Sequence, residues 1–130
     1  MSNKNTNPKE TKNYIDLLYM TPCEVKARDI ALLLQDMKGI SIQLWNEMNI
    51  LELEFQNGNS IDFEPLKASF KAPSDAAFIE KHRIKTIFAV SLCEADLPAA
   101  VSCFEKIAIN YSGFLCADSK DFTPVYAGAI

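Results

Sequence analysis

Four acidic residues recur at alternating positions in the middle of the chain, where they could together bind a cationic partner. They are Glu52, Glu54, Asp62 and Glu64. Side chains at alternate positions of a strand share one face, so a hairpin would gather all four on one surface. Like charges at neighbouring cross-strand positions cost up to about 1 kcal/mol, a repulsion that a basic partner would relieve. Trp45 is expected beside them and would add aromatic contact area.

The same charges also have a simpler interpretation. A sheet face that carries many charges stays solvated and resists aggregation without binding anything. Both interpretations require the four carboxylates to point away from the hydrophobic core.

A second acidic set lies in two loops that each follow a predicted strand. Glu94 and Asp96 form one pair, and Asp118 and Asp121 form the other. Strands of one β-α-β unit end at the same sheet edge, so these oxygens could converge on Mg²⁺ or Ca²⁺. The alternative is structural, because Asp96 can cap a helix and Asp118 suits a turn. The loops lack the ligand density and glycine of a calcium site, so we predict neither a metal nor a cofactor.

His82 is the only histidine in the chain. It lies between Lys81 and Arg83, whose charges disfavour its protonated form, and no serine or cysteine beside it forms a nucleophile motif. We expect an exposed residue near a helix end. Lys81, Arg83 and Lys85 could hold a phosphate or carboxylate, although cations near a helix end also favour the helix dipole without a ligand.

The four cysteines, Cys23, Cys93, Cys103 and Cys116, contain no C-x-x-C pair and fall within predicted helices and strands. We expect reduced, buried thiols of a cytosolic (cytoplasmic) protein, with raised pKa values and low reactivity. Cys93 and Cys116 could alternatively form a redox pair. The chain has no phosphate-binding glycine loop, no G-x-S-x-G and no H-E-x-x-H motif, which favours a non-enzymatic protein.

Length and composition predict one domain with its own core. The chain has 130 residues, 48% of them hydrophobic, and a formal net charge of -4. This charge argues against a nucleic-acid partner, and no apolar run reaches membrane-spanning length. Residues 1–13, rich in Asn, Lys and Thr, predict a disordered lead-in; residues 14–126 form the predicted α+β domain, and residues 127–130 are expected to fray.

The stretch 86–118 is the centre of the predicted fold. Residues 86–93 are apolar at both parities, which indicates an interior strand. A helix with one apolar stripe follows, with Asp96 as its cap, and ends near Asn110 before a strand at 114–117. Residues 14–45 repeat this pattern, with a strand at 14–20, a helix that a capping box at 21–24 would begin, and a strand at 40–45.

A meander joins the two β-α-β units. Residues 40–45, 50–55 and 61–64 each alternate between apolar and polar positions, and Asn57-Gly58 predicts a tight hairpin, since both residues accept positive φ. Periodicity is absent from Pro65 to Pro73. Ser74 is expected to cap a short helix at 75–82.

These elements predict an α+β fold of the ferredoxin-like two-layer sandwich type, with the helices on one face of the sheet and the other face free. The preferred function is a non-enzymatic protein-interaction module, in its sharper form an immunity or antitoxin-type inhibitor of a basic partner. A homodimer would be another way to use the open face. The alternative is a small-molecule-binding regulatory domain or a small enzyme of the dimeric α+β barrel kind, with a cavity near residues 65–73 that Trp45 or Tyr14 would reach.

Overall fold

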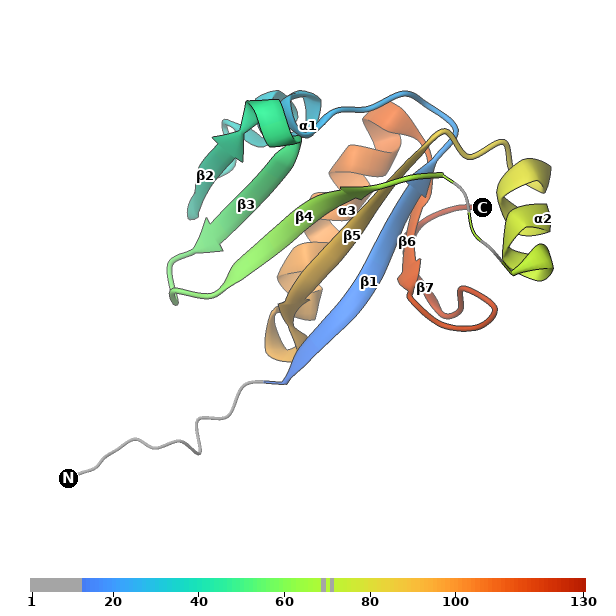
Figure 1. The fold of residues 1–130 in the computed structure, drawn as a ribbon. Helices are drawn as coiled ribbons and strands as arrows, with labels where there is room; N and C mark the ends of the chain where they lie inside the picture. The colour runs from blue at the N-terminus through green and yellow to red at the C-terminus, as the bar shows by residue number, and fades with distance from the viewer. Residues whose placement is uncertain (1–12, 69, 71) are drawn as a thin grey trace.

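A seven-stranded antiparallel sheet forms the centre of the structure, a computed structural model that describes residues 13–68, 70 and 72–130. The spatial order of the strands is β2-β3-β4-β5-β1-β6-β7 (Figure 1). The strands are β1 (Tyr14–Thr21), β2 (Ile40–Trp45), β3 (Ile50–Phe55), β4 (Ser60–Leu66), β5 (Thr86–Cys93), β6 (Phe114–Ala117) and β7 (Val125–Gly128). Except for Asn13, the expected lead-in lies outside the described residues.

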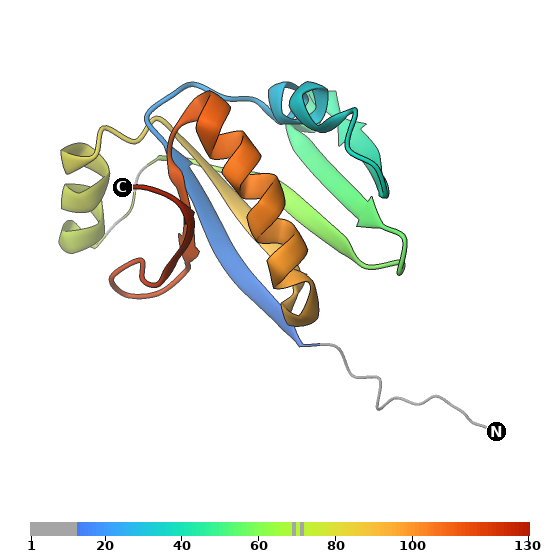
Figure 2. The ribbon, with the colours of Figure 1, turned by 180° about the vertical axis from the view of Figure 1, so that it is seen from behind.

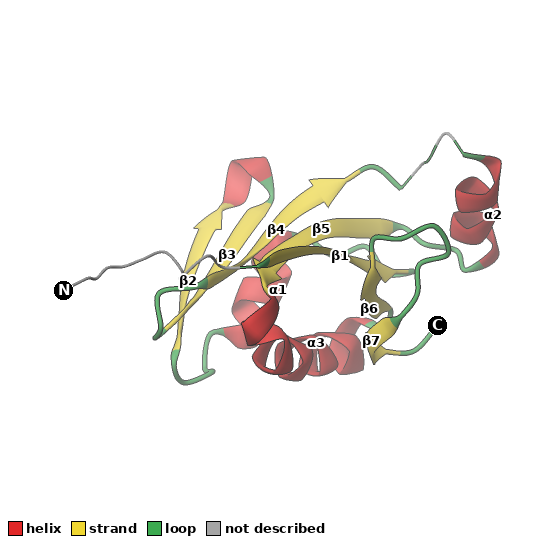
Figure 3. Cartoon of the chain, turned by 90° about the horizontal axis from the view of Figure 1, so that it is seen from below, coloured by secondary structure: helices red, strands yellow, loops and turns green. Residues whose placement is uncertain are grey.

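Three α-helices accompany the sheet: α1 (Ala27–Leu34), α2 (Pro73–Lys81) and α3 (Leu97–Tyr111). Helices α1 and α3 cover the same face of the sheet, as predicted (Figures 2 and 3). Helix α2 packs through Phe78 and Ile79 into a cluster on the opposite face. The expectation that every helix would lie on one face is therefore wrong for α2. None of the helices in the described part of the chain is long and apolar enough to cross a membrane.

Strand β5 lies in the middle of the sheet, between β4 and β1, which confirms the predicted interior strand. Its two faces enter two different apolar clusters. Phe88, Val90 and Leu92 face α1 and α3, and Ile87 faces the α2 side. A strand buried on both sides needs apolar residues at both parities, and this is the pattern that the sequence displays.

The two β-α-β connections join strands that are not neighbours in the sheet. Strands β5 and β6 run in the same direction but are separated by β1, and β1 and β2 are separated by three strands. Every neighbouring pair is antiparallel. The meander of β2, β3 and β4 is confirmed. Asn57 and Gly58 lie in the loop of the β3–β4 hairpin, as predicted, and of the two only Gly58 has a positive φ, of 89°.

The first long helix starts later than predicted, at Ala27, and the expected capping box at 21–24 does not begin it. The Lys26 amide, just before the helix, donates instead to Oδ2 of Asp29 across 2.9 Å. The Thr21 hydroxyl donates to the carbonyl oxygen of Tyr111 across 2.5 Å. The amide of Ala27 donates to Oδ1 of Asn49 across 2.6 Å, so an amide at the start of α1 is satisfied from the loop between β2 and β3. The backbone between Thr21 and Ala27 is irregular in consequence.

Two further predicted caps are absent. Helix α2 begins at Pro73 after Ala72, so Ser74 lies inside the helix. Helix α3 begins at Leu97, and the side chain of Asp96 makes no capping hydrogen bond. Proline in the first turn suits both helices because the amides there have no helical partner.

The end of the described chain is more ordered than expected. Ala127 and Gly128, which were predicted to fray, are the last two residues of β7, and Ala127 is buried. Gly113, with φ of 86°, permits the close approach of β6 to β1 at this end of the sheet. A Cβ atom there would overlap the backbone oxygen of Met20 and the Thr21 side chain, so only glycine fits.

Candidate functional site on the open sheet face

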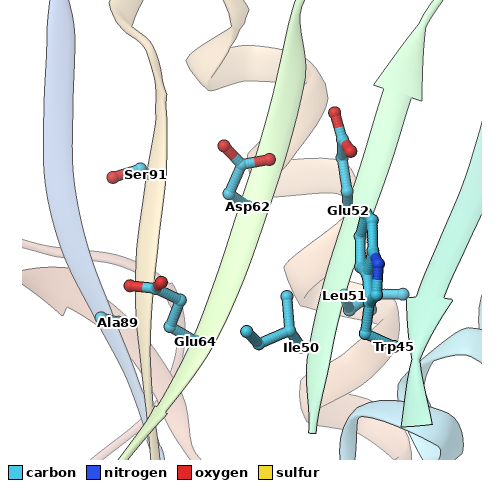
Figure 4. Close-up of a pocket in the computed structure, with 8 residues that line it drawn as sticks. All are labelled: Trp45, Ile50, Leu51, Glu52, Asp62, Glu64, Ala89 and Ser91. Carbon is cyan, nitrogen blue, oxygen red and sulfur yellow. The ribbon is translucent and has the colours of Figure 1, made fainter. Parts of the chain in front are cut away.

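The sheet face opposite α1 and α3 is covered only in part. The α2 cluster covers it over β1, β6 and the adjoining end of β5. Over β2, β3, β4 and the rest of β5 the face has a hollow of about 340 Å³. Figure 4 shows the residues that line it, which are Trp45, Ile50, Leu51, Glu52, Asp62, Glu64, Ala89 and Ser91.

The strand register places two carboxylates directly opposite each other. Glu52 faces Asp62, and Asp62 in turn faces Ser91. The Phe55 amide donates to the carbonyl oxygen of Asn59, which makes that pair a hydrogen-bonded one. Hydrogen-bonded and non-hydrogen-bonded pairs alternate along an antiparallel ladder, so Glu52 and Asp62, three steps along, form a non-hydrogen-bonded pair. Side chains approach most closely in pairs of this kind.

No cation neutralises this group within the described residues. Neither Glu52, Glu54 nor Glu64 forms an ion pair with any lysine or arginine that the structure describes. Asp62 accepts a hydrogen bond from the Ser60 hydroxyl at 3.1 Å, which adds no positive charge. The negative charge of the face is therefore left to solvent or to a partner.

The acidic row continues beyond the predicted residues. Ser91 lies between Asp62 on β4 and Asp16 on β1, and its hydroxyl donates to Oδ1 of Asp16 across 2.9 Å. Glu52, Asp62 and Asp16 thus lie on one line across four neighbouring strands. We refer to Glu52, Glu54, Asp62, Glu64 and Asp16 together as the acidic face.

Trp45 forms one wall of the hollow. It lies opposite Ile50 in the register, and 45% of its surface is exposed. In Figure 4 its indole lies near Glu52, with Asp62 and Glu64 across the hollow. Of the five residues predicted to bind a partner, these four line the hollow.

The fifth predicted residue, Glu54, lies on the same face next to the hollow, opposite Ser41 and Ser60. The sequence did not indicate Ala89, Ser91 or Asp16, because their part in the site depends on β5 lying beside β4 and on β1 lying beside β5. The small outward residues of β5 were the available signal, since they leave room above the sheet.

The carboxylates of the two acidic loops do not converge as the metal-site hypothesis requires. Among the described residues, no group of three metal-ligating side chains lies close enough to hold an ion. The buried carboxylate of Asp96 instead accepts hydrogen bonds from the side-chain amides of Asn57, at 3.1 Å, and Asn59, at 2.8 Å. This clamp fastens the β3–β4 hairpin to the start of α3.

The remaining loop carboxylates have local roles or none. The Glu94 amide donates to Asn13 and the Asp118 amide to Asp16, so the two loops lie on either side of the beginning of β1. Asp121 accepts a hydrogen bond from the Thr123 hydroxyl at 2.6 Å, and this bond lowers the pKa of the Asp121 carboxyl.

The cysteines are not arranged for redox chemistry. All four are free, and Cys23 alone is partly exposed. Leu18 of β1 pairs with Ala89 of β5 on one side and with Cys116 of β6 on the other. Cys116 is therefore level with Ala89, whereas Cys93 lies four residues further along β5. Burial raises the pKa of the Cys116 thiol to about 12 and that of the Cys103 thiol in the same direction.

His82 lies at the end of α2, as expected, with its ring centroid 4.4 Å from that of Phe78. It is partly exposed, and Lys81, Arg83 and Lys85 around it are exposed. No described nucleophile hydrogen-bonds to His82, so the structure gives it a packing contact with Phe78.

The fold and site together define an α+β protein with a seven-stranded antiparallel sheet and an acidic hollow on its open face. A comparison of the chain with protein-family models, curated proteins and solved structures finds no match.

Proposed function

We propose that the protein is a non-enzymatic interaction module that binds a basic protein partner through its acidic face. The observation that carries this proposal is the pairing of Glu52 with Asp62 at a close cross-strand position, with no described cation beside either carboxylate. Such a pair destabilises the free protein, and a partner that supplies lysine or arginine side chains would remove the penalty.

The surroundings of the pair suit a protein partner. Trp45 is a large, half-exposed aromatic side chain at the rim of the hollow, and tryptophan is enriched among the residues that dominate binding energy. Carboxylates that extend over four strands would steer a basic surface towards the hollow before contact. The sharper form of the proposal is an immunity or antitoxin-type inhibitor that covers the cationic active site of a nuclease toxin.

We also propose a ferredoxin-like core within the larger sheet. The chain order β1, α1, β4, β5, α3, β6 gives the spatial strand order β4-β5-β1-β6, with α1 and α3 on one face. This is the β-α-β-β-α-β arrangement with a hairpin, β2–β3, inserted after α1 and a strand, β7, added at the end. The inserted hairpin carries Trp45, Glu52 and Glu54, so the candidate site would be an addition to the core.

The test uses a short lysine-rich peptide and a glutamate-rich peptide of the same length as probes, with titration calorimetry at low and at physiological salt. We expect the lysine-rich peptide alone to bind, and the double variant Glu52→Lys with Glu54→Lys to abolish binding without lowering the melting temperature. The control variant, Glu24→Lys with Glu105→Lys, makes the same change in net charge at exposed positions off the acidic face.

The control variant should keep most of the affinity. If both double variants weaken binding equally, net charge and not the acidic face attracts the peptide. If Glu52→Lys with Glu54→Lys leaves the affinity unchanged, the proposal is wrong.

The hollow itself favours a second candidate, a small-molecule-binding regulatory domain or a small enzyme of the dimeric α+β barrel kind. Its volume of about 340 Å³ is within the range of ligand pockets. The hollow contains Trp45, as this alternative requires, but lies over β2 to β5 and does not include Tyr14. A small amine such as spermidine that binds with one-to-one stoichiometry, and loses affinity in Trp45→Ala, would favour this candidate.

A further inference from the structure

The two edges of the sheet differ in how well they are protected against pairing with another strand. The β7 edge is four residues long, follows Pro124, and pairs with β6 through a register shift at Leu115 and Cys116. Short length, proline and irregular pairing all discourage strand addition. The β2 edge, Ile40–Trp45, is six residues long, contains no charge and no proline, and pairs with β3 in unbroken register.

The register identifies the peptide groups that β2 presents at this edge. The Phe55 amide bonds towards β4, so the odd-numbered residues of β3 bond to β4 and the even-numbered ones bond to β2. The β2 partners of these even-numbered residues are Ser41, Gln43 and Trp45. The N–H and C=O groups of Ile40, Ile42 and Leu44 therefore point outward, away from the sheet.

The side chains near this edge are also unusually apolar. Ile40, Ile42 and Leu44 lie on the face that α1 covers, and Leu44 is 38% exposed. Met48, in the 3₁₀ turn that follows β2, is 61% exposed. An uncharged edge strand with exposed apolar neighbours is a template for another strand.

We propose that β2 pairs in antiparallel fashion with β2 of a second copy of this chain, which joins the two sheets into one. Residues that lie opposite each other in an antiparallel pair point to the same face of the sheet. The two-fold axis must therefore lie at the level of one residue, which then pairs with its own copy, and not between two residues. An axis at Ile42 places Ile40 opposite Leu44 of the second copy and uses every outward peptide group. An axis at Gln43 would leave the group of Ile40 unpaired.

The charges of the acidic face permit this dimer. Strand β2 itself carries no charge, and Glu52 lies one strand further in on each copy. The two Glu52 side chains would be three strand spacings apart, about 14 Å, which exceeds the Debye length of about 8 Å at physiological salt. Both acidic faces would lie on the same side of the joined sheet. The dimer does not depend on the proposed basic partner.

The test measures the mass of the full-length chain by sedimentation and by light scattering over a range of concentrations. The variant Leu44→Pro removes an outward amide without breaking a bond to β3, and Leu44→Ala is its matched control, since it shortens the side chain but keeps the amide. We expect wild type and Leu44→Ala to dimerise, and Leu44→Pro to raise the dissociation constant by about tenfold or more.

A second variant tests the same interface in case Leu44→Pro does not fold. Ser41 and Gln43 are exposed and lie opposite Glu54 and Glu52 of the same chain. Ser41→Glu with Gln43→Glu would therefore place unneutralised carboxylates opposite each other across the axis at Ile42. Val125→Lys, on the β7 edge, is the control and should leave the dimer intact. A wild-type chain that stays monomeric at all concentrations overturns the inference. So does a dimer that survives both β2 variants, or one that Glu52→Lys with Glu54→Lys dissociates.

Discussion

Neutralising one carboxylate of the Glu52–Asp62 pair should stabilise the free protein. Glutamine has nearly the same size as glutamate, so Glu52→Gln removes the charge and keeps the side-chain packing. The two residues are directly opposite each other at a close cross-strand position, and neither has a cation beside it among the described residues. The charge repulsion between them is thus the main interaction that the substitution changes.

The size of the effect follows from the distance and the surroundings. Two unit charges about 5 Å apart repel by about 0.8 kcal/mol in water. Asp62 is exposed and Glu52 is partly exposed, so the medium between them is close to water. Measured cross-strand pairs contribute about 0.2–1 kcal/mol, and we expect Glu52→Gln to raise the free energy of unfolding by about 0.5 kcal/mol.

The assay is urea unfolding at low salt and at about 1 M NaCl, where the Debye length falls to about 3 Å. Urea is uncharged and does not itself screen the pair. The stabilisation by Glu52→Gln should largely disappear at high salt. Asp62→Asn should give a similar gain, and the double variant only slightly more, because both substitutions remove the same repulsion.

Glu105→Gln, at an exposed position on α3, is the matched control and should change the free energy of unfolding very little. A Glu52→Gln gain no larger than that of the control, or one that persists at 1 M salt, would refute the reasoning. The acidic face would then hold no electrostatic energy for a basic partner to release.

Two further predictions concern buried groups. Asp96→Ala should lower the free energy of unfolding by about 2–4 kcal/mol, because two hydrogen bonds to a charged group are lost with it; in a double-mutant cycle with Asn57→Ala, a coupling energy near zero would show that the clamp does not contribute. The Cys116 thiol has its pKa raised to about 12, and an unfolded thiol ionises near about 8.5. The free energy of unfolding should therefore fall as pH rises above about 9, since the unfolded chain loses its proton first. Urea unfolding from pH 8 to pH 10 should show a shallower fall in Cys116→Ala, and equal slopes would contradict the prediction.

Local sequence patterns were enough to identify most elements and the faces that they bury. The apolar residues at both parities of 86–93 predicted an interior strand, and β5 is one, although its Ala89 and Ser91 line the hollow on the open face. The alternation in β3 and β4 was sufficient to place Glu52 and Asp62 on the face away from α1 and α3. Local periodicity carries this information because the hydrophobic effect acts on each side chain through the face on which it lies.

The starts of the helices were beyond the reach of local patterns. The box at 21–24 satisfied the sequence rule for a cap, yet the Thr21 hydroxyl bonds to Tyr111, and the first amide of α1 bonds to Asn49. The Asp96 carboxylate likewise accepts hydrogen bonds from Asn57 and Asn59 of the hairpin, and it does not cap the helix that it precedes. Local and long-range partners share the start of α1, since the Lys26 amide also donates to Oδ2 of Asp29. The long-range bonds are the ones that local sequence patterns do not predict.

The order of the strands was decided only by the tertiary structure. A period of two shows which face of a strand is apolar, but it does not show which strand lies beside it. The position of β1 between β5 and β6 brought Asp16 next to Ser91. Helix α2 has only a short apolar stripe, so its place on the opposite face followed from the cluster that Phe114 and Phe122 offered it. Pairing between strands depends on contacts that form when the whole chain packs, and these contacts set the limits of the acidic face.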